Sequence, residues 1–407
     1  MSSPVITGIG VIAPTGVGVD EHWQAVLAGK LGIARISRFD AAGYPVQLAG
    51  EVTGVSVKEL LPRRLVPQID RWTQLAVLAG EYALADATLN PAELPEYEMA
   101  VVTSSSSGGT EFGQNEMTRL YRNGPSHVGA YQSIAWFYAA TTGQLSIKHG
   151  MRGPCGVLAC EQAGGLDALG QVRRLLRREA RLVISGGTDA SLCPYGVVAQ
   201  LPIGYLSTSD DPEQAYLPFD VDAAGYVPGE GGAIFAVETA ESALERGVPN
   251  YGAILGYAAG FDPPPGSERP PVLRRTIERA IADAGLLPSD VDVVFADAMG
   301  VPEKDLAESQ AISAVFGPGG VPVTAPKTLT GRLYGGGAPL DVATALLALR
   351  DGIIPHTAGP TELAPGIDID LVLGQPRPAP LRTALVLARG YGGFTSALVL
   401  GAGDRTA

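Results

Sequence analysis

The stretch GPCGVLACEQAGGLDALGQVRRLLRR, residues 153–178, has the pattern of a strand, a sharp turn and an amphipathic helix. Val157 to Cys160 predicts a short buried strand, and apolar residues from Leu166 onward repeat at helical spacing. Such a turn presents a side chain at a helix N-terminus, where free N–H groups stabilise a thiolate or an oxyanion. Gln162 stands at this turn. Its amide can form hydrogen bonds but cannot attack a thioester.

Cys160, two residues before the turn, is the alternative nucleophile. Strand alternation puts it on the same face as Leu158, and a free cysteine in an apolar run is usually a core residue. Cys155 and Cys193 have no metal-ligand spacing with any histidine, so we expect no metal site. The glycine-rich segments 229–232 and 390–393 open no helix in the frame of a phosphate loop, so we expect no nucleotide site.

The elements around this turn alternate between strands and helices. Strands are predicted over 4–13, 99–104, 181–185, 232–238, 251–257, 291–297, 383–388 and 395–400, and helices over 72–87, 306–316 and 339–350, with another from Leu273 that stops at Gly285. Several strands are continuous apolar runs, which is typical of strands covered on both faces. The alternation predicts α/β layers.

Two glycine-rich turns, at 229–232 and 390–393, each lead into an apolar strand, which suggests that the chain contains two similar halves. The polar segment TAESALERGVPN lies between them. We therefore expect one half over residues 1–248 and the other over 249–407.

Composition excludes several classes of protein. Hydrophobic residues make up 46% of the 407, but no apolar run approaches the ~18 residues needed to cross a bilayer, so we expect no membrane span. A formal charge of −13 argues against a nucleic-acid partner. Three cysteines cannot build a disulfide framework, and the first residues resemble a strand rather than a signal peptide. These features predict a cytoplasmic protein.

The turn resembles the nucleophile turn of β-ketoacyl synthases, with Gln162 at the place of their cysteine. The form EQAGGLDALG is similar to the chain-length factors of type II aromatic polyketide synthases. The likeness runs from TGIGVIAPTG to ARGYGG and includes LSTSDDPEQAYLPFDVDAAGYVPGEGGA. It implies a thiolase-like fold, in which two similar α/β halves pack as five layers, αβαβα.

Two further positions depart from the condensing enzymes that the chain resembles. In VDVVFADAMGVPEKDLAESQAI the place of the first catalytic histidine holds Met299, and in APKTLTGRLYGGGAPLDVATALL that of the second holds Arg332. Lys327, Asp305 and Glu308 match the family's framework around those histidines. The resemblance therefore implies a retained fold that has lost its catalytic triad.

The resemblance also implies partners. It predicts a heterodimer with an active ketosynthase alpha subunit and substrates, malonyl and polyketide chains, borne by an acyl carrier protein. No cofactor is implied for this chain, because the phosphopantetheine belongs to the carrier. Three alternatives remain at this point: an active condensing enzyme that uses Cys160, a structural subunit without influence on the product, and a priming role for Gln162 through malonyl-carrier decarboxylation.

Residues 110–121 (TEFGQNEMTRLY) predict a helix whose positions 110, 113 and 117 share one face. In chain-length factors the corresponding face carries the gate at the tunnel's end, where aromatic residues accompany shorter products. Thr110, Gly113 and Met117 are not aromatic, which predicts a decaketide rather than an octaketide product. The segment 127–144 groups Tyr131, Trp136, Phe137 and Tyr138, which indicates either part of the subunit interface or an ordinary core helix.

Overall fold

The computed structural model describes residues 4–54, 56–178, 180–264 and 266–406. Its main strands fall into two sets of five. The first set is β1 (Pro4–Ala13), β5 (Met99–Ser104), β6 (Cys155–Leu158), β7 (Leu182–Asp189) and β8 (Gly231–Thr239). The second set is β9 (Gly252–Phe261), β10 (Val293–Phe295), β11 (Pro322–Thr324), β15 (Thr383–Arg389) and β16 (Phe394–Ala402).

The two sets of strands have the same topology. The spatial order is β6-β5-β7-β8-β1 in the first and β11-β10-β15-β16-β9 in the second. In each, the first three strands are parallel, and the last two pair antiparallel. The two glycine-rich segments singled out in the sequence precede equivalent strands, β8 and β16. This shared topology is the structural form of the duplication that the sequence suggested.

The remaining strands are short. β13 (Asp370–Leu371) extends the second sheet beside β11, and β2 (Gly16–Val17) pairs with the end of β1. β3 (Ile33–Arg35) with β4 (Leu48–Gly50), and β12 (Ile353–Ile354) with β14 (Arg377–Pro378), form separate two-stranded ribbons. Two residue pairs between β1 and β9 join the sheets along one edge.

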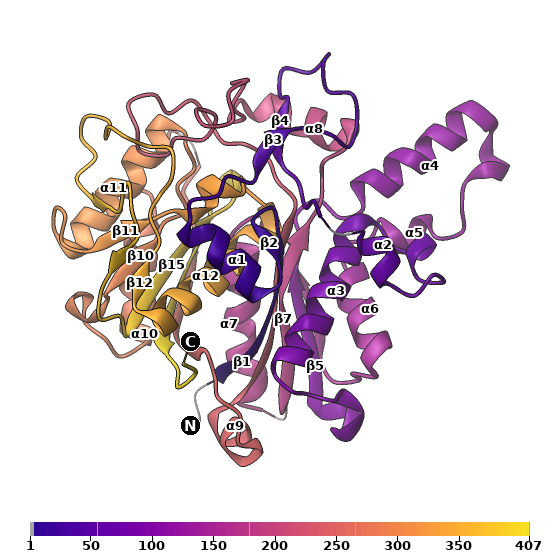
Figure 1. Cartoon of the computed structure of the whole chain (residues 1–407), viewed down its shortest axis with the longest axis horizontal. Helices are drawn as coiled ribbons and strands as arrows, with labels where there is room; N and C mark the ends of the chain where they lie inside the picture. The colour runs from indigo at the N-terminus through magenta and orange to yellow at the C-terminus, as the bar shows by residue number, and fades with distance from the viewer. Residues whose placement is uncertain (1–3, 55, 179, 265, 407) are drawn as a thin grey trace.

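The helices and the sheets form five layers (Figure 1). α3 (Arg71–Asp86) and α6 (Ala140–His149) cover the outer face of the first sheet, and α10 (Leu273–Asp283) and α11 (Pro302–Phe316) that of the second. α7 (Gly164–Leu176) and α12 (Gly337–Asp351) lie between the sheets. The other helices are α1 (Val19–Leu27), α2 (Val57–Leu60), α4 (Thr110–Asn123), α5 (Gln132–Ala135), α8 (Pro194–Gln200) and α9 (Ala240–Arg246). The predicted αβαβα thiolase-like fold is confirmed.

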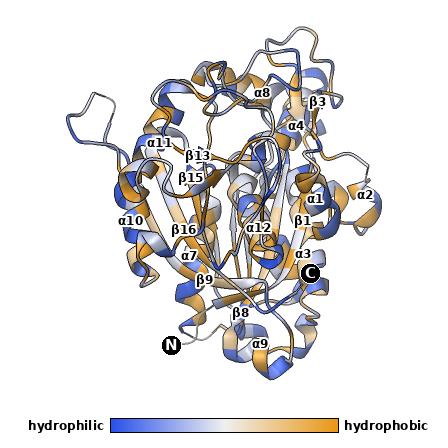
Figure 2. Ribbon diagram, turned by 60° about the vertical axis from the view of Figure 1, so that its left-hand side comes forward, coloured by the Kyte–Doolittle hydropathy of each residue, from blue (hydrophilic) through white to orange (hydrophobic). Residues whose placement is uncertain are grey.

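The central layer explains why the sequence forms these elements. α12 is buried at every position from Gly337 to Leu349 and has apolar residues on all sides, as a helix between two sheets requires. Figure 2 shows hydrophobic residues through the strands and central helices, with hydrophilic segments mainly on outer helices and loops. Strands β5, β7 and β8 are buried almost throughout, in agreement with their apolar runs.

Candidate functional site

The turn between β6 and α7 carries Gln162. The strand ends at Leu158, two residues earlier than predicted, and it is a partly exposed edge strand rather than a buried one. Glu161 has a φ of 50°, a left-handed conformation that makes the chain turn sharply into the helix. The Gln162 side chain is fully buried, and its Nε2 donates to Asp297 Oδ1 at 3.4 Å. Its Oε1 has no hydrogen-bond partner among the described residues.

Cys160 lies in the turn beyond the end of the strand, and its side chain is partly exposed. Burial of the thiol, together with the nearby Asp167 carboxylate, raises the pKa of Cys160 to about 11. A reactive cysteine needs a lowered pKa, because the thiolate is the nucleophile. The environment of Cys160 therefore works against its use as a nucleophile, and the prediction that it packs in a strand core is wrong.

Arg332 is buried to 1% exposure and is paired with Asp297. Its Nη1 and Nη2 donate to the two oxygens of that carboxylate, each at 3.2 Å. Nη1 also donates to the Asp297 carbonyl at 3.1 Å, and Nη2 to the Arg389 carbonyl at 2.9 Å. Arg389 brings a second guanidinium to the same carboxylate at 3.2 Å. Burial alone would raise the pKa of Asp297, but these two arginines lower it to about 2.

Lys327, Glu308 and Asp305 hold the backbone around Asp297. Lys327 Nζ donates to the Ala296 and Asp297 carbonyls at 2.8 and 3.0 Å. The Glu308 carboxylate accepts the backbone N–H groups of residues 297 and 298 at 2.7 and 2.9 Å, and also pairs with Arg389 at 2.8 Å. Asp305 accepts the N–H groups of residues 219 and 300 at 2.9 and 3.0 Å. These three side chains hold the loop after β10 in place.

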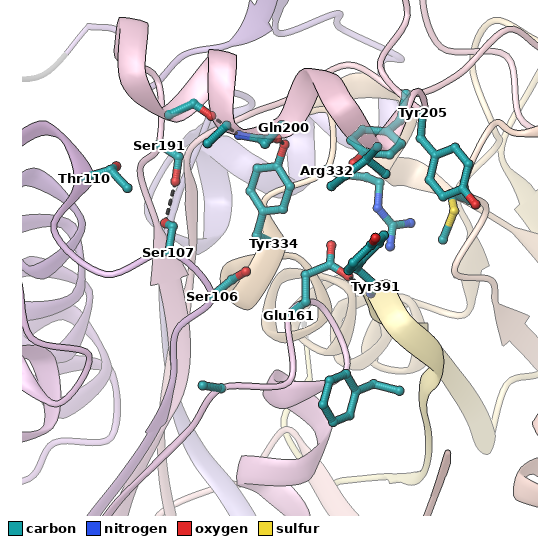
Figure 3. A pocket seen from close by; sticks show the side chains of 17 residues that line it. Ser106, Ser107, Thr110, Glu161, Ser191, Gln200, Tyr205, Arg332, Tyr334 and Tyr391 are labelled. Carbon is teal, nitrogen blue, oxygen red and sulfur yellow. Dashed lines mark hydrogen bonds between the residues drawn. The ribbon is translucent and has the colours of Figure 1, made fainter. Parts of the chain in front are cut away.

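A cavity of about 330 Å³ lies beside this cluster, and Figure 3 shows Arg332, Glu161 and several tyrosines around it. Met299 forms part of its wall and is 7% exposed, packed among Tyr226, Tyr334 and other apolar residues. Gln162 does not line the cavity. The described lining includes hydroxyl groups but no cysteine or histidine: Ser106, Ser107, Thr110, Ala159, Glu161, Ser191, Gly196, Ala199, Gln200, Ile203, Tyr205, Tyr226, Met299, Arg332, Tyr334, Tyr391 and Phe394.

Comparison with known proteins identifies this arrangement. The family described as "Beta-ketoacyl synthase, N-terminal domain" matches residues 2–243, and "Beta-ketoacyl synthase, C-terminal domain" matches residues 251–360. The chain belongs to the β-ketoacyl synthase family. That Gln162, Met299 and Arg332 occupy the catalytic positions of this family stays a prediction from the sequence.

Several relatives share nearly the full length of the chain. The tetracenomycin polyketide synthase ketoacyl synthase beta subunit of Streptomyces glaucescens is 56% identical, over 98% of this chain and 99% of that protein. The actinorhodin polyketide putative β-ketoacyl synthase 2 of Streptomyces coelicolor is 54% identical over 98% of each chain. A solved structure described as the ishigamide ketosynthase/chain length factor is 26% identical, with a TM-score of 0.88, over 98% of this chain and 99% of that one. Within the β-ketoacyl synthase family, the chain thus belongs with the chain-length factors, as predicted.

The three predicted gate positions on α4 have different surroundings in the structure. Thr110 lines the cavity. Gly113 is buried, and a Cβ placed there would lie 3.2 Å from Cδ1 of Trp136. Met117 is 48% exposed. The three positions lie along one side of the helix, but only Thr110 of the three borders the cavity within this chain.

The segment 127–144 is not an ordinary core helix. It forms a loop, the short α5 and the start of α6, and Tyr131, Ile134, Trp136 and Phe137 are 39–54% exposed. A cluster of exposed large apolar side chains marks an interaction surface in a protein that is otherwise well packed. These four residues form what we call the apolar patch.

Sequence reasoning missed the residues that define the electrostatics of this β-ketoacyl synthase site. Asp297 and Arg389 were not singled out, although Asp297 lies two residues before Met299, and Arg389 is the second residue of the ARGYGG segment. The available signal was a charged residue within or at the end of an otherwise apolar run. Among the described residues no group of histidine, cysteine and acidic side chains could hold a metal ion, and no described helix is long and apolar enough to cross a membrane.

Proposed function

We propose that this chain is the non-condensing beta subunit of a type II polyketide ketosynthase. In this role it shapes the tunnel for the growing polyketide and sets its length in aromatic polyketide biosynthesis. The strongest support is the replaced site, since Gln162, Met299 and Arg332 supply neither a thiolate nor an imidazole. Arg332 is also committed to Asp297, so its charge is already neutralised.

The partner that we propose is a ketosynthase alpha subunit that carries the cysteine and histidines. Two features support such a heterodimer. β6 is the last strand of its sheet, pairing only with β5 among the described strands, and a free edge can pair with another chain. The apolar patch adds a surface of the kind found at the core of obligate interfaces. The extender and growing chains would come to this complex on an acyl carrier protein, whose phosphopantetheine is the only prosthetic group the reaction requires.

The face of α4 formed by positions 110, 113 and 117 is the gate in this proposal. Thr110 borders the cavity, and Gly113 leaves Trp136 room to lie against the helix. Because none of the three gate side chains is aromatic, we expect a decaketide product. Thr110→Phe and Gly113→Phe should each shorten the product by one or more two-carbon units, while condensation continues at the partner's cysteine.

The test is co-expression of each variant with one fixed ketosynthase and carrier, followed by mass analysis of the unreduced products. Thr118→Phe is the matched control, because it places the same side chain at an exposed position of the same helix. Unchanged product length in soluble, active Thr110→Phe and Gly113→Phe complexes would contradict the gate assignment. Shortening in the Thr118→Phe control would show that any bulky residue on α4 has this effect.

The three alternative functions left open by the sequence are supported to different degrees. Condensation through Cys160 is disfavoured by the raised pKa of its thiol. A priming role for Gln162 requires a substrate to reach its amide, yet that side chain is fully buried and outside the cavity lining. A purely structural subunit predicts that exchanging this chain under a fixed ketosynthase leaves the product length unchanged, and the same co-expression experiment measures this.

A further inference from the structure

The helix that carries the gate, α4, stands out from the body of the molecule (Figure 1). It packs mainly against α5, α8 and the turn Pro125–His127. Behind it, on the side opposite the gate positions, lies a polar cavity of about 630 Å³, whose lining includes Gln74, Asn115, Glu116 and Arg119. The rear of α4 therefore faces a polar space, so its position must depend on a few specific contacts.

The first turn of α4 lacks a cap of its own. Its N-cap residue is Gly109, which has no side chain to accept the free N–H groups of that turn. The carboxylate of Asp70 supplies the missing acceptor from another element, since its Oδ2 accepts the Phe112 N–H at 2.6 Å.

The same carboxylate caps a second helix. Asp70 is the N-cap of α3, and its Oδ1 accepts the Trp72 N–H at 3.2 Å. The side chain is 2% exposed. One buried carboxylate thus ties α4 to α3, which covers the first sheet. A second contact, the Arg38–Glu111 ion pair at 2.6 Å, holds the same turn but is partly exposed.

We propose that Asp70 is a positioning residue for product length, which acts through Phe112 on the placement of the gate. Thr110 lies two residues before Phe112 in the same helical turn, so fixing that turn fixes the gate residue in the cavity wall. It also fixes the direction in which α4 carries Gly113 and Met117. This inference rests on the proposed function, because it concerns how the gate is held rather than whether it exists.

Asp70→Ser separates the two contacts. A serine at the N-cap still accepts the Trp72 N–H of α3, but it has one oxygen on a shorter side chain and loses the bond to Phe112. The matched control is Thr239→Ala, which removes the N-cap of α9, where Thr239 Oγ1 accepts the Ser242 N–H at 3.2 Å. Both variants alter a helix cap, but only one of those caps belongs to the gate helix.

Two readouts on the co-expressed complex test the proposal. Hydrogen exchange at the Phe112 amide should accelerate about tenfold in Asp70→Ser and stay unchanged in Thr239→Ala. The product spectrum under one ketosynthase should broaden to neighbouring chain lengths in Asp70→Ser alone. Faster exchange with an unaltered product spectrum would overturn the proposal, as would unaltered exchange.

Comparison with the gate variants distinguishes a failure of the positioning role of Asp70 from a failure of the gate assignment. If Gly113→Phe shifts product length and Asp70→Ser does not, the positioning role fails and the proposed function stands. If neither Gly113→Phe nor Thr110→Phe shifts it, the gate assignment itself fails. Should the Asp70→Ser complex not accumulate, Asp70→Asn replaces it, because its single amide oxygen can serve only one of the two N–H groups.

Discussion

Replacing Arg332 by methionine tests whether this buried arginine stabilises the folded protein. The guanidinium is 1% exposed and donates four hydrogen bonds, two of them to the Asp297 carboxylate. Methionine fills similar space but leaves that carboxylate buried with one cation fewer. Breaking a buried ion pair costs ~3–5 kcal/mol. Because Arg389 still contacts Asp297, we expect a loss near the lower end, about 3 kcal/mol.

Thermal unfolding of the purified complex measures this loss. Arg332 and Asp297 both belong to the second half of the chain, which has the size of an ordinary domain. For a unit of that size, about 3 kcal/mol lowers Tm by roughly 6–12 °C. Arg274→Met is the control, since Arg274 pairs with Glu278 at 2.8 Å on an exposed helix surface, where such pairs contribute about 0.5 kcal/mol or less.

The charge itself is tested by the double variant Arg332→Met with Asp297→Asn. Removing both charges should restore part of the lost Tm, because the single variant suffers from an unbalanced carboxylate rather than only from lost packing. A Tm for Arg332→Met within about 1 °C of the parent would refute the structural role of this arginine. A fall no larger than that of the Arg274→Met control would refute it equally.

Three further outcomes follow from the same site. Gln162→Cys should give no condensation in a ketosynthase-free preparation, because we expect Met299 and Arg332 at the places of the two catalytic histidines. Turnover of acyl-carrier substrate would contradict this. Iodoacetamide at pH 7.5 should modify the exposed Cys155 well before Cys160, because a pKa of about 11 leaves roughly 0.03% of Cys160 as thiolate. Peptide mapping that finds Cys160 modified first would support Cys160 as a nucleophile. The pKa of Asp297 is lowered on folding from 3.8 to about 2, so its stabilisation of the native state is complete above pH 4 and disappears toward pH 2. That contribution is on the order of 2 kcal/mol, so acid unfolding should begin at higher pH in Arg332→Met than in the parent.

Much of the fold could be predicted because buried strands and amphipathic helices leave strong local patterns. The run 4–13 matches β1, and 99–104 matches β5, residue for residue. The predicted strand at 157–160 was misplaced because Ala159 and Cys160 continue an apolar run whose backbone already turns. The hydrophobic pattern predicts which residues are buried, but it does not predict the residue at which the chain changes direction. That change occurs at Glu161, which has a positive φ and lies one residue before Gln162, where the sequence predicted the turn.

The site could be predicted only as a set of replacements. Gln162, Met299 and Arg332 stand out against a family pattern, and that pattern says which chemistry is missing. What took its place depends on contacts between residues far apart in the chain, such as Arg332 with Asp297 and with the Arg389 carbonyl. An arginine can replace a histidine inside a closed core only if a carboxylate neutralises it, because an unpaired buried charge is too costly to keep. The arginine and its carboxylate are therefore best understood as a unit that keeps the charge balanced in the closed core, at the place where the family pattern predicts a catalytic histidine.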